Sequence, residues 1–186
     1  MSALVVLDID DVLTQTRERV YHAMLATTGI DIHWQHWDEY DLRPRYRLTH
    51  EELMDAFNQH DLINEVHLEE GAREFIASCK EAGYRVATLT ARGWHPQAEA
   101  HTWAYFERHQ LAIDELHVCT PSECKSDWIK RLGPVHLYVD DHLNHILNVQ
   151  EKTANVTHLA LMDRPWNQGE HGVRRVFSLH DCLSLL

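Results

Sequence analysis

Residues 5–14, VVLDIDDVLT, combine a short apolar run with three carboxylates placed within four residues. A run this short indicates a buried parallel strand rather than a helix. Ligands of open α/β sheets bind where the strands end at their carboxyl termini. Because residues two apart in a strand face the same side, Asp8 and Asp10 can point into one pocket while Ile9 enters the core.

The two carboxylates of Asp8 and Asp10 would repel each other unless a cation lay between them. Mg2+ is suited to this place, since it prefers oxygen ligands and commonly binds one or two carboxylates together with substrate phosphate. The alternative is that these acids only cap the helix that follows, where Asp is favourable. One cap requires one Asp and not three, so the sequence favours a metal site.

The bulk composition limits the classes of function. The 186 residues suit one domain with a small insertion. The 17 basic and 29 acidic residues give a formal charge of −12, which opposes binding of extended nucleic acid but allows a small anionic substrate. The N-terminal residues carry no basic flank and the first apolar run meets acids at once. We therefore expect neither a signal peptide nor a membrane span, and a cytoplasmic protein.

Cysteine and histidine provide no second metal site in this interpretation. The closest cysteines, Cys119 and Cys124, are too widely spaced for a Cys-x-x-Cys motif, and Cys79 and Cys182 lie far away. The 16 histidines are scattered and form no His-Glu-x-x-His pattern. We expect the cysteines to be buried thiols or bystanders.

A helical insertion follows the first strand. Apolar spacing predicts a helix over 17–27, and Thr49 with Glu52 forms a capping box that predicts a second helix over 50–60. Residues 30–50 alternate aromatic and charged side chains without a clear period. We assign residues 14–68 to a helical cap, and residues 1–13 and 69–186 to an α/β core.

The remaining chain alternates strands with helices, which predicts a Rossmann-like parallel sheet with helices on both faces. The predicted strands cover 84–89, 116–119, 136–139 and 156–162. The predicted helices cover 71–82, 97–109, 127–132 and 143–150, and the tail over 178–186 is expected to be helical.

Polar side chains recur at the ends of the predicted strands. Thr90 follows one strand, Lys125 lies in the loop after another, and Asp140 with Asp141 ends a third. Each has an ordinary alternative: a β-branched strand residue, a solvated surface lysine, or a helix cap. In a parallel sheet, however, all these ends meet at one edge, so we expect them to converge with Asp8 and Asp10.

These motifs, in this order, resemble the four motifs of the haloacid dehalogenase-like (HAD) phosphohydrolases: Asp-x-Asp-x-Val-Leu over 8–13, the strand ending in Thr90, Lys125, and Asp140-Asp141. The cap, the helix start Gly71-Ala72, LTAR over 89–92 and DRPWN over 163–167 most resemble the 5'(3')-deoxyribonucleotidase type. One position departs from that family, because Asp11 stands where Gly is usual. Asp11 either caps the next helix or reshapes this loop.

Chemistry and resemblance together suggest a role for each motif. Asp8 is the expected nucleophile, and Asp10 the general acid and base. The resemblance implies Mg2+ bound by Asp8, the Asp10 carbonyl and Asp141, with Asp140 as the competing carboxylate that sequence separates poorly. Thr90, Ala91, Arg92 and Lys125 are expected to bind phosphate, Lys130 being the competing lysine.

The cap offers candidate substrate contacts. Aromatic side chains there could stack on a base or could form the core of the cap. Arginines beside them could guide anions or pair with Asp38 and Asp41. After the last predicted strand, Arg164, Trp166 and Asn167 either close the rim of the pocket or form a turn at Pro165. The candidate substrate residues of the cap are Trp34, Trp37, Tyr40, Arg45 and Tyr46.

The expected function is a Mg2+-dependent phosphomonoesterase that acts on nucleoside monophosphates, deoxyribonucleotides first, through an aspartyl-phosphate. Alternatives are a phosphatase of another small metabolite or of a nucleic-acid terminal phosphate, and a catalytically silent binding module with the same fold. We expect a monomer or homodimer with a small phosphorylated substrate, without extended nucleic acid or membrane as partner.

Overall fold

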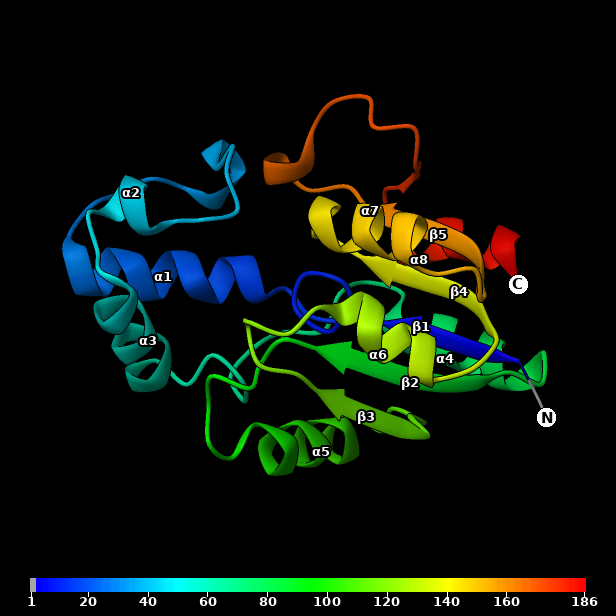
Figure 1. Ribbon diagram of the computed structural model, residues 1–186. Coiled ribbons are helices and arrows are strands. Elements are labelled where there is room, and N and C mark those ends of the chain that lie inside the picture. Colours follow the sequence, from blue (N-terminus) through cyan, green and yellow to red (C-terminus); the bar gives the residue numbers. More distant parts are fainter. Residues whose placement is uncertain (1–2) are drawn as a thin grey trace.

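The structure, a computed structural model, describes residues 3–186 and contains one six-stranded parallel sheet of order β3-β2-β1-β4-β5-β6 (Figure 1). The chain starts in the middle of the sheet and builds outward on both sides of β1, so the order reverses between β1 and β4. Such a reversal opens a crevice at the carboxyl ends of the two strands. The strands are β1 (Leu4–Leu7), β2 (Arg85–Thr90), β3 (Glu115–Val118), β4 (Val135–Asp140), β5 (Val156–Met162) and β6 (Arg174–Val176).

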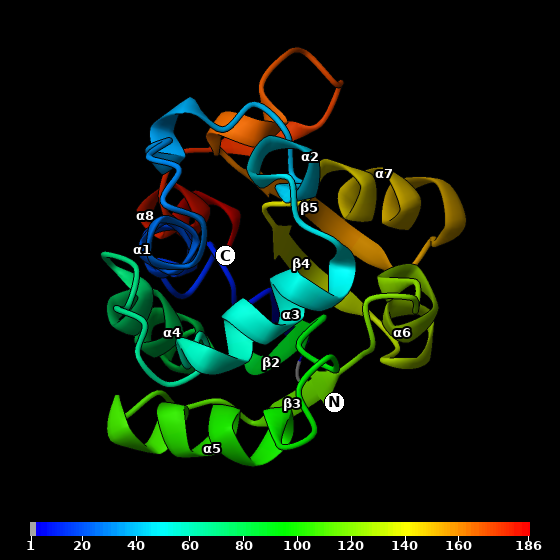
Figure 2. The ribbon, with the colours of Figure 1, turned by 90° about the vertical axis from the view of Figure 1, so that its left-hand side faces the viewer.

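Helices cover both faces of the sheet (Figure 2). Val5 and Leu7 point to the face covered by α4 (Ala72–Glu81), α5 (Ala98–Arg108) and α8 (Leu179–Cys182). Leu4 and Val6 point to the opposite face, under α6 (Lys125–Arg131) and α7 (Leu143–Lys152). This alternation follows the two-residue period of a strand and buries β1 on both sides. The predicted α/β class is confirmed.

The predicted elements are confirmed within a few residues, and the strand over 156–162 has the predicted bounds. Lys125 was expected in a loop, but it is the first residue of α6. The expected helical tail is shorter than predicted, with α8 followed by the 3-10 turn η3 (Leu183–Leu185). Four elements were not predicted: β6, the short helix α2 (Arg43–Tyr46), the 3-10 turn η1 (Trp34–His36), and η2 (Pro165–Asn167).

Three helices lie beyond the carboxyl ends of the strands, the side to which the arrows point in Figure 1. They are α1 (Thr16–Thr28), α2 (Arg43–Tyr46), which was not predicted, and α3 (His50–Gln59). The predicted capping box of α3 is present, since Thr49 Oγ1 accepts from Glu52 N and the Glu52 carboxylate accepts from Thr49 N. These helices share an apolar cluster of their own that includes Met24 and Leu53, and we refer to them as the cap.

Two segments connect these helices to the sheet and lie side by side. Gln15 N donates to His67 O at 2.8 Å, and Glu69 N donates to Leu13 O at 2.9 Å. We call this pair of segments, residues 13–15 and 67–69, the crossing.

No helix within residues 3–186 is both long enough and apolar enough to span a membrane.

Candidate active site

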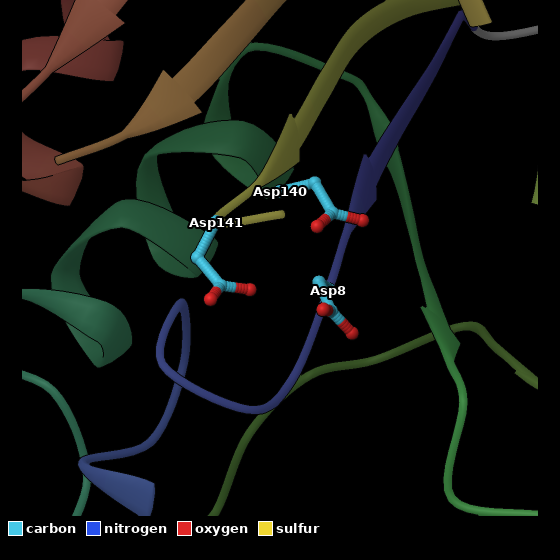
Figure 3. A group of neighbouring side chains, drawn as sticks. All are labelled: Asp8, Asp140 and Asp141. Carbon is cyan, nitrogen blue, oxygen red and sulfur yellow. The ribbon is translucent and has the colours of Figure 1, made fainter. Parts of the chain in front are cut away.

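Three carboxylates converge at the carboxyl ends of β1 and β4 (Figure 3). Asp8 follows β1, Asp140 ends β4 and Asp141 follows it, so adjacent strands bring them together. One carboxylate oxygen from each lies within 4.8 Å of the others, and all three residues are buried. Burial of three like charges requires compensation by cations.

One ammonium group lies between two of these carboxylates. Lys125 Nζ is 2.9 Å from Asp8 Oδ2 and 2.8 Å from Asp140 Oδ2, and its side chain is 1% exposed. The competing Lys130 is one turn and a half further along α6 and pairs with Asp127 in solvent at 3.2 Å. The structure therefore brings Lys125 to the carboxylates and leaves Lys130 on the surface.

The three clustered carboxyl groups differ in pKa because their surroundings differ. Burial raises the pKa of Asp8 to about 7, and the neighbouring Lys125 only partly opposes this rise. Burial and the adjacent Asp140 raise the pKa of Asp141 well above its usual range. Burial also disfavours ionisation of Asp140, but Lys125 and His145 outweigh it and hold its pKa low. One lysine is thus too little positive charge for the whole cluster.

Asp140 and Asp141 differ in their hydrogen bonds. The Asp140 carboxylate accepts from Lys125 Nζ, from the Tyr138 hydroxyl and, at 2.8 Å, from His142 N. Within residues 3–186, the Asp141 carboxylate accepts one hydrogen bond, from Trp166 Nε1 at 2.8 Å. The Asp141 oxygens are therefore more available to bind a metal ion than those of Asp140, a difference that the sequence did not reveal.

Asp10 lies beside this cluster and is held by Arg92. Arg92 Nε donates to Asp10 Oδ2 at 2.9 Å and Nη2 donates to Oδ1 at 2.7 Å, while the Thr16 hydroxyl donates to Oδ1 at 2.7 Å. Burial raises the pKa of Asp10, but the charge and hydrogen bonds of Arg92 more than offset it, so the pKa is lowered. Sequence reasoning missed Thr16, whose side chain carries no distinguishing motif.

Asp11 caps α1, the first of the two alternatives that the sequence left open, and it does so from a left-handed backbone conformation. Its φ of +58° places it in the left-handed region, which Asp tolerates better than most residues. Its Oδ1 accepts from Arg17 N in the first turn of α1 at 2.9 Å and pairs with the Arg17 guanidinium at 3.0 Å. Glu69 joins Arg17 at 3.1 Å and Arg164 at 3.0 Å, which connects the crossing to the loop after β5.

Thr90 is the last residue of β2, and Ala91 and Arg92 begin the loop that follows it. The Thr90 hydroxyl lies 3.5 Å from Asp10 Oδ2, and Ala91 lines the neighbouring cavity. Gly93 holds this loop close to β3, because its N–H donates to Cys119 O at 3.0 Å and a Cβ there would lie 2.7 Å from that oxygen. Any larger residue would displace the loop that carries the predicted phosphate contacts.

A cavity of about 390 Å3 lies between the helices of the cap and the carboxylates. Its floor contains Asp8, Asp10 and Lys125. The walls are mostly apolar and come from both the cap and the core. The volume of the cavity falls within the usual range of about 300–1,000 Å3 for ligand pockets. The wall residues include Val20, Trp37, Leu42, Leu53, Met54, Phe57, Leu62, Trp94 and Trp166.

The predicted cap residues divide into two groups. Trp37 and Tyr40 line the cavity, whereas Trp34, Arg45 and Tyr46 do not. Trp37 and Tyr46 are buried, and Trp37 Nε1 donates to the Tyr46 hydroxyl at 3.2 Å, which places both in the core of the cap. Arg45 pairs with Asp38.

The segment after β5 supports the acidic cluster. Besides the bond from Trp166, Asn167 Nδ2 donates to the Asp141 backbone carbonyl at 2.7 Å, and Arg164 Nε donates to Asp11 O at 3.0 Å.

Three further residues that line the cavity were not predicted, namely Phe57, Met54 and His145. A helical apolar stripe gives no signal that separates cavity walls from ordinary core, so sequence could not identify them.

No protein-family model matches the sequence, and no curated protein matches it. Solved structures do match along the whole chain. A predicted phosphatase from Clostridium acetobutylicum is 14% identical with a TM-score of 0.68, covering 99% of this chain and 97% of that one. A HAD-superfamily hydrolase of subfamily IA from Geobacter sulfurreducens is 15% identical, with a TM-score of 0.64 and 100% of both chains covered.

A predicted phosphoglycolate phosphatase from Haemophilus somnus has 13% identity and a TM-score of 0.66, with 99% of this chain and 97% of that chain covered. At these identities the likeness concerns the fold. The chain therefore has the HAD-type α/β fold.

Proposed function

We propose that the protein is a Mg2+-dependent phosphomonoesterase that hydrolyses nucleoside monophosphates, most similar in type to the 5'(3')-deoxyribonucleotidases. The observation that carries this proposal is the convergence of Asp8, Asp140 and Asp141, with Lys125 paired to Asp8 and Asp140, next to a largely apolar cavity whose floor includes Asp8 and Lys125. The floor suits a cation and a phosphate group, and the walls suit a flat organic group.

The donor set fits a magnesium ion. Asp8 and Asp141 would hold it with carboxylate oxygens, and the Asp10 carbonyl would add a third oxygen. Asp140 is the weaker candidate, because its oxygens already accept from Lys125, Tyr138 and His142. When bound, the ion neutralises phosphate charge and favours the ionised form of Asp8.

The residues of the chain then divide the reaction into two steps. An Asp8 carboxylate oxygen attacks phosphorus, the bond from phosphorus to the alcohol oxygen breaks, and Asp10 in its protonated form gives that oxygen a proton. Arg92 opposes this protonated form, whereas the negative charge of a phosphate group bound beside Asp10 favours it. In the second step Asp10 takes a proton from water as the water oxygen attacks phosphorus. The bond from phosphorus to Asp8 then breaks, which frees phosphate and restores both acids.

Phosphate oxygens would be held by the Thr90 hydroxyl, the N–H groups at Ala91 and Arg92, and Lys125. Lys125 is already placed against Asp8 at 2.9 Å, so it balances the negative charge that gathers when phosphate enters. These donors are fixed before substrate arrives, which lowers the cost of stabilising the transition state.

The walls of the cavity favour a nucleoside over a sugar as the leaving alcohol. Phe57 of α3 and Trp94 of the loop after β2 meet edge to face with ring centroids 5.7 Å apart. Trp37 and Tyr40 add aromatic surface, and aromatic faces stack on bases with little sequence preference. The second candidate is a phosphatase of another small metabolite, which the similarity to a predicted phosphoglycolate phosphatase favours.

A phosphate-release assay separates these candidates. Metal-stripped protein would be given Mg2+ and matched concentrations of deoxynucleoside, nucleoside and sugar monophosphates, phosphoglycolate, and an oligonucleotide with a terminal phosphate. We expect Mg2+-dependent release, fastest from the deoxynucleotides and absent in Asp8→Asn. Faster turnover of a sugar phosphate or of phosphoglycolate would overturn the nucleotidase proposal, and an undiminished rate in Asp8→Asn would overturn Asp8 as nucleophile.

A further inference from the structure

Arg92 was expected to bind phosphate, but its guanidinium group is already engaged on three sides. Nε and Nη2 hold the two oxygens of Asp10, and Nη1 lies 3.3 Å from the Thr102 hydroxyl. The Arg92 side chain is 1% exposed, and Thr102 lies buried on α5 behind it. The group is therefore packed into the core of the protein and aimed at Asp10.

Asp10 accepts hydrogen bonds on both carboxylate oxygens, while 33% of its side chain remains exposed. Oδ2 accepts from Arg92 Nε, and Oδ1 accepts both from Arg92 Nη2 and from Thr16, at 2.7 Å each. A planar guanidinium that binds both oxygens of a carboxylate fixes its plane as well as its position. The hydroxyl from the first residue of α1 fixes the same carboxylate from the side of the cap.

We infer that Arg92 is a positioning residue for Asp10, holding that carboxylate where it can exchange a proton with the leaving alcohol and with water. The inference rests on the proposed function. Proton transfer requires heavy atoms within hydrogen-bond reach, and a misplacement of about 1 Å can cost about 100-fold in rate. Arg92 thus acts on the reaction through Asp10, and phosphate is held by Thr90, the backbone N–H groups and Lys125.

The test compares two leaving groups in the first turnover. Release of a nucleoside from its monophosphate needs a proton at the departing oxygen, whereas 4-nitrophenolate departs without one. Rapid quenching would measure both releases in Arg92→Gln, in Arg92→Lys, and in Thr102→Val, which keeps the fork on Asp10. Circular dichroism would check that each variant is folded.

We expect Arg92→Gln to slow release of the nucleoside about 100-fold or more and of 4-nitrophenol less than about tenfold. Arg92→Lys keeps the charge but not the fork, so it should show the same contrast at smaller size. Thr102→Val should change neither rate more than about threefold. Equal loss for both leaving groups, with weaker inhibition by inorganic phosphate, would identify Arg92 as a phosphate ligand and overturn the inference.

Thr16→Val provides a second route to the same carboxylate, should Arg92→Gln fail to fold. It removes the hydroxyl from Asp10 Oδ1 and should slow the nucleoside selectively, whereas equal slowing of both leaving groups would contradict the inference. A wild-type protein that releases neither group overturns the proposed function and this inference with it. Wild-type release of both, with an unselective effect of Arg92→Gln, overturns the inference alone.

Discussion

Replacing Lys125 with methionine would remove the ammonium that lies between Asp8 and Asp140. Its Nζ is 2.9 and 2.8 Å from the two carboxylates, and all three side chains are buried, so solvent cannot replace the lost charge. Methionine retains most of the apolar stem, which limits the loss of packing. The remaining cost is that of two buried carboxylates facing each other without a cation.

Removal of one partner from a buried ion pair costs about 3–5 kcal/mol. For a chain of 186 residues this corresponds to a fall in Tm of about 6–20 °C. Urea unfolding followed by circular dichroism, with metal removed by a chelator, would measure the free energy of unfolding. Addition of Mg2+ should return part of the lost stability, because a cation that binds the folded state stabilises it by mass action.

Lys130→Met is the matched control. Lys130 lies on the same helix and pairs with Asp127, but both side chains are about half exposed. An exposed pair of this kind contributes about 0.2–1 kcal/mol. Phosphatase activity should disappear in Lys125→Met and remain in Lys130→Met. Equal stability of the two variants would refute the reasoning that Lys125 compensates the acidic cluster.

Three further predictions concern other parts of the chain. Phe57→Ala should raise KM for nucleoside monophosphates by the equivalent of about 0.5–1.5 kcal/mol and leave KM for sugar phosphates unchanged, because it removes an aromatic wall and no polar contact. An equal rise in KM for both substrate classes would contradict the stacking of a nucleobase on this wall. Asp11→Ala should have a free energy of unfolding about 1–2 kcal/mol lower than that of Asp11→Gly, as measured by urea unfolding. Both variants lose the bonds to Arg17, but only Ala is strained at the φ of +58°. The reverse order would show that backbone strain is absent. In the native protein, a thiol reagent should modify Cys124 first, since a hydrogen bond from Ser126 lowers its pKa while burial raises the pKa of the other three thiols; rapid reaction of all four would indicate that the core opens readily.

The parts of the fold that sequence predicted are those where local pattern and tertiary environment agree. β5 was predicted with its bounds because its apolar run is interrupted at both ends, and α3 because its capping box marks the first turn. β6 was missed because Arg174, Arg175 and Val176 have no strand pattern of their own. They form a strand only by pairing with β5 at the edge of the sheet.

The site was predictable to the extent that topology determines it. Parallel strands bring Asp8 and Asp140 to one edge whatever their loops do, so their meeting could be expected. The partner of Arg92 could not be, because its choice between a phosphate and Asp10 depends on how the loop at Gly93 packs against β3. The division of the cap aromatics between core and cavity likewise depends on packing that has no sequence period.

The crossing has a consequence for how such proteins diversify. Leu13, where the chain leaves the core, and Glu69, where it returns, are joined by a backbone hydrogen bond of 2.9 Å. The two ends of the insertion therefore lie side by side at the carboxyl edge of the sheet. A short turn could join these ends without rearranging the strands, and a longer or different segment could equally be placed there. The segment between these ends can therefore be exchanged while Asp8, Lys125, Asp140 and Asp141, which all lie outside it, keep their places at the carboxyl ends of the strands.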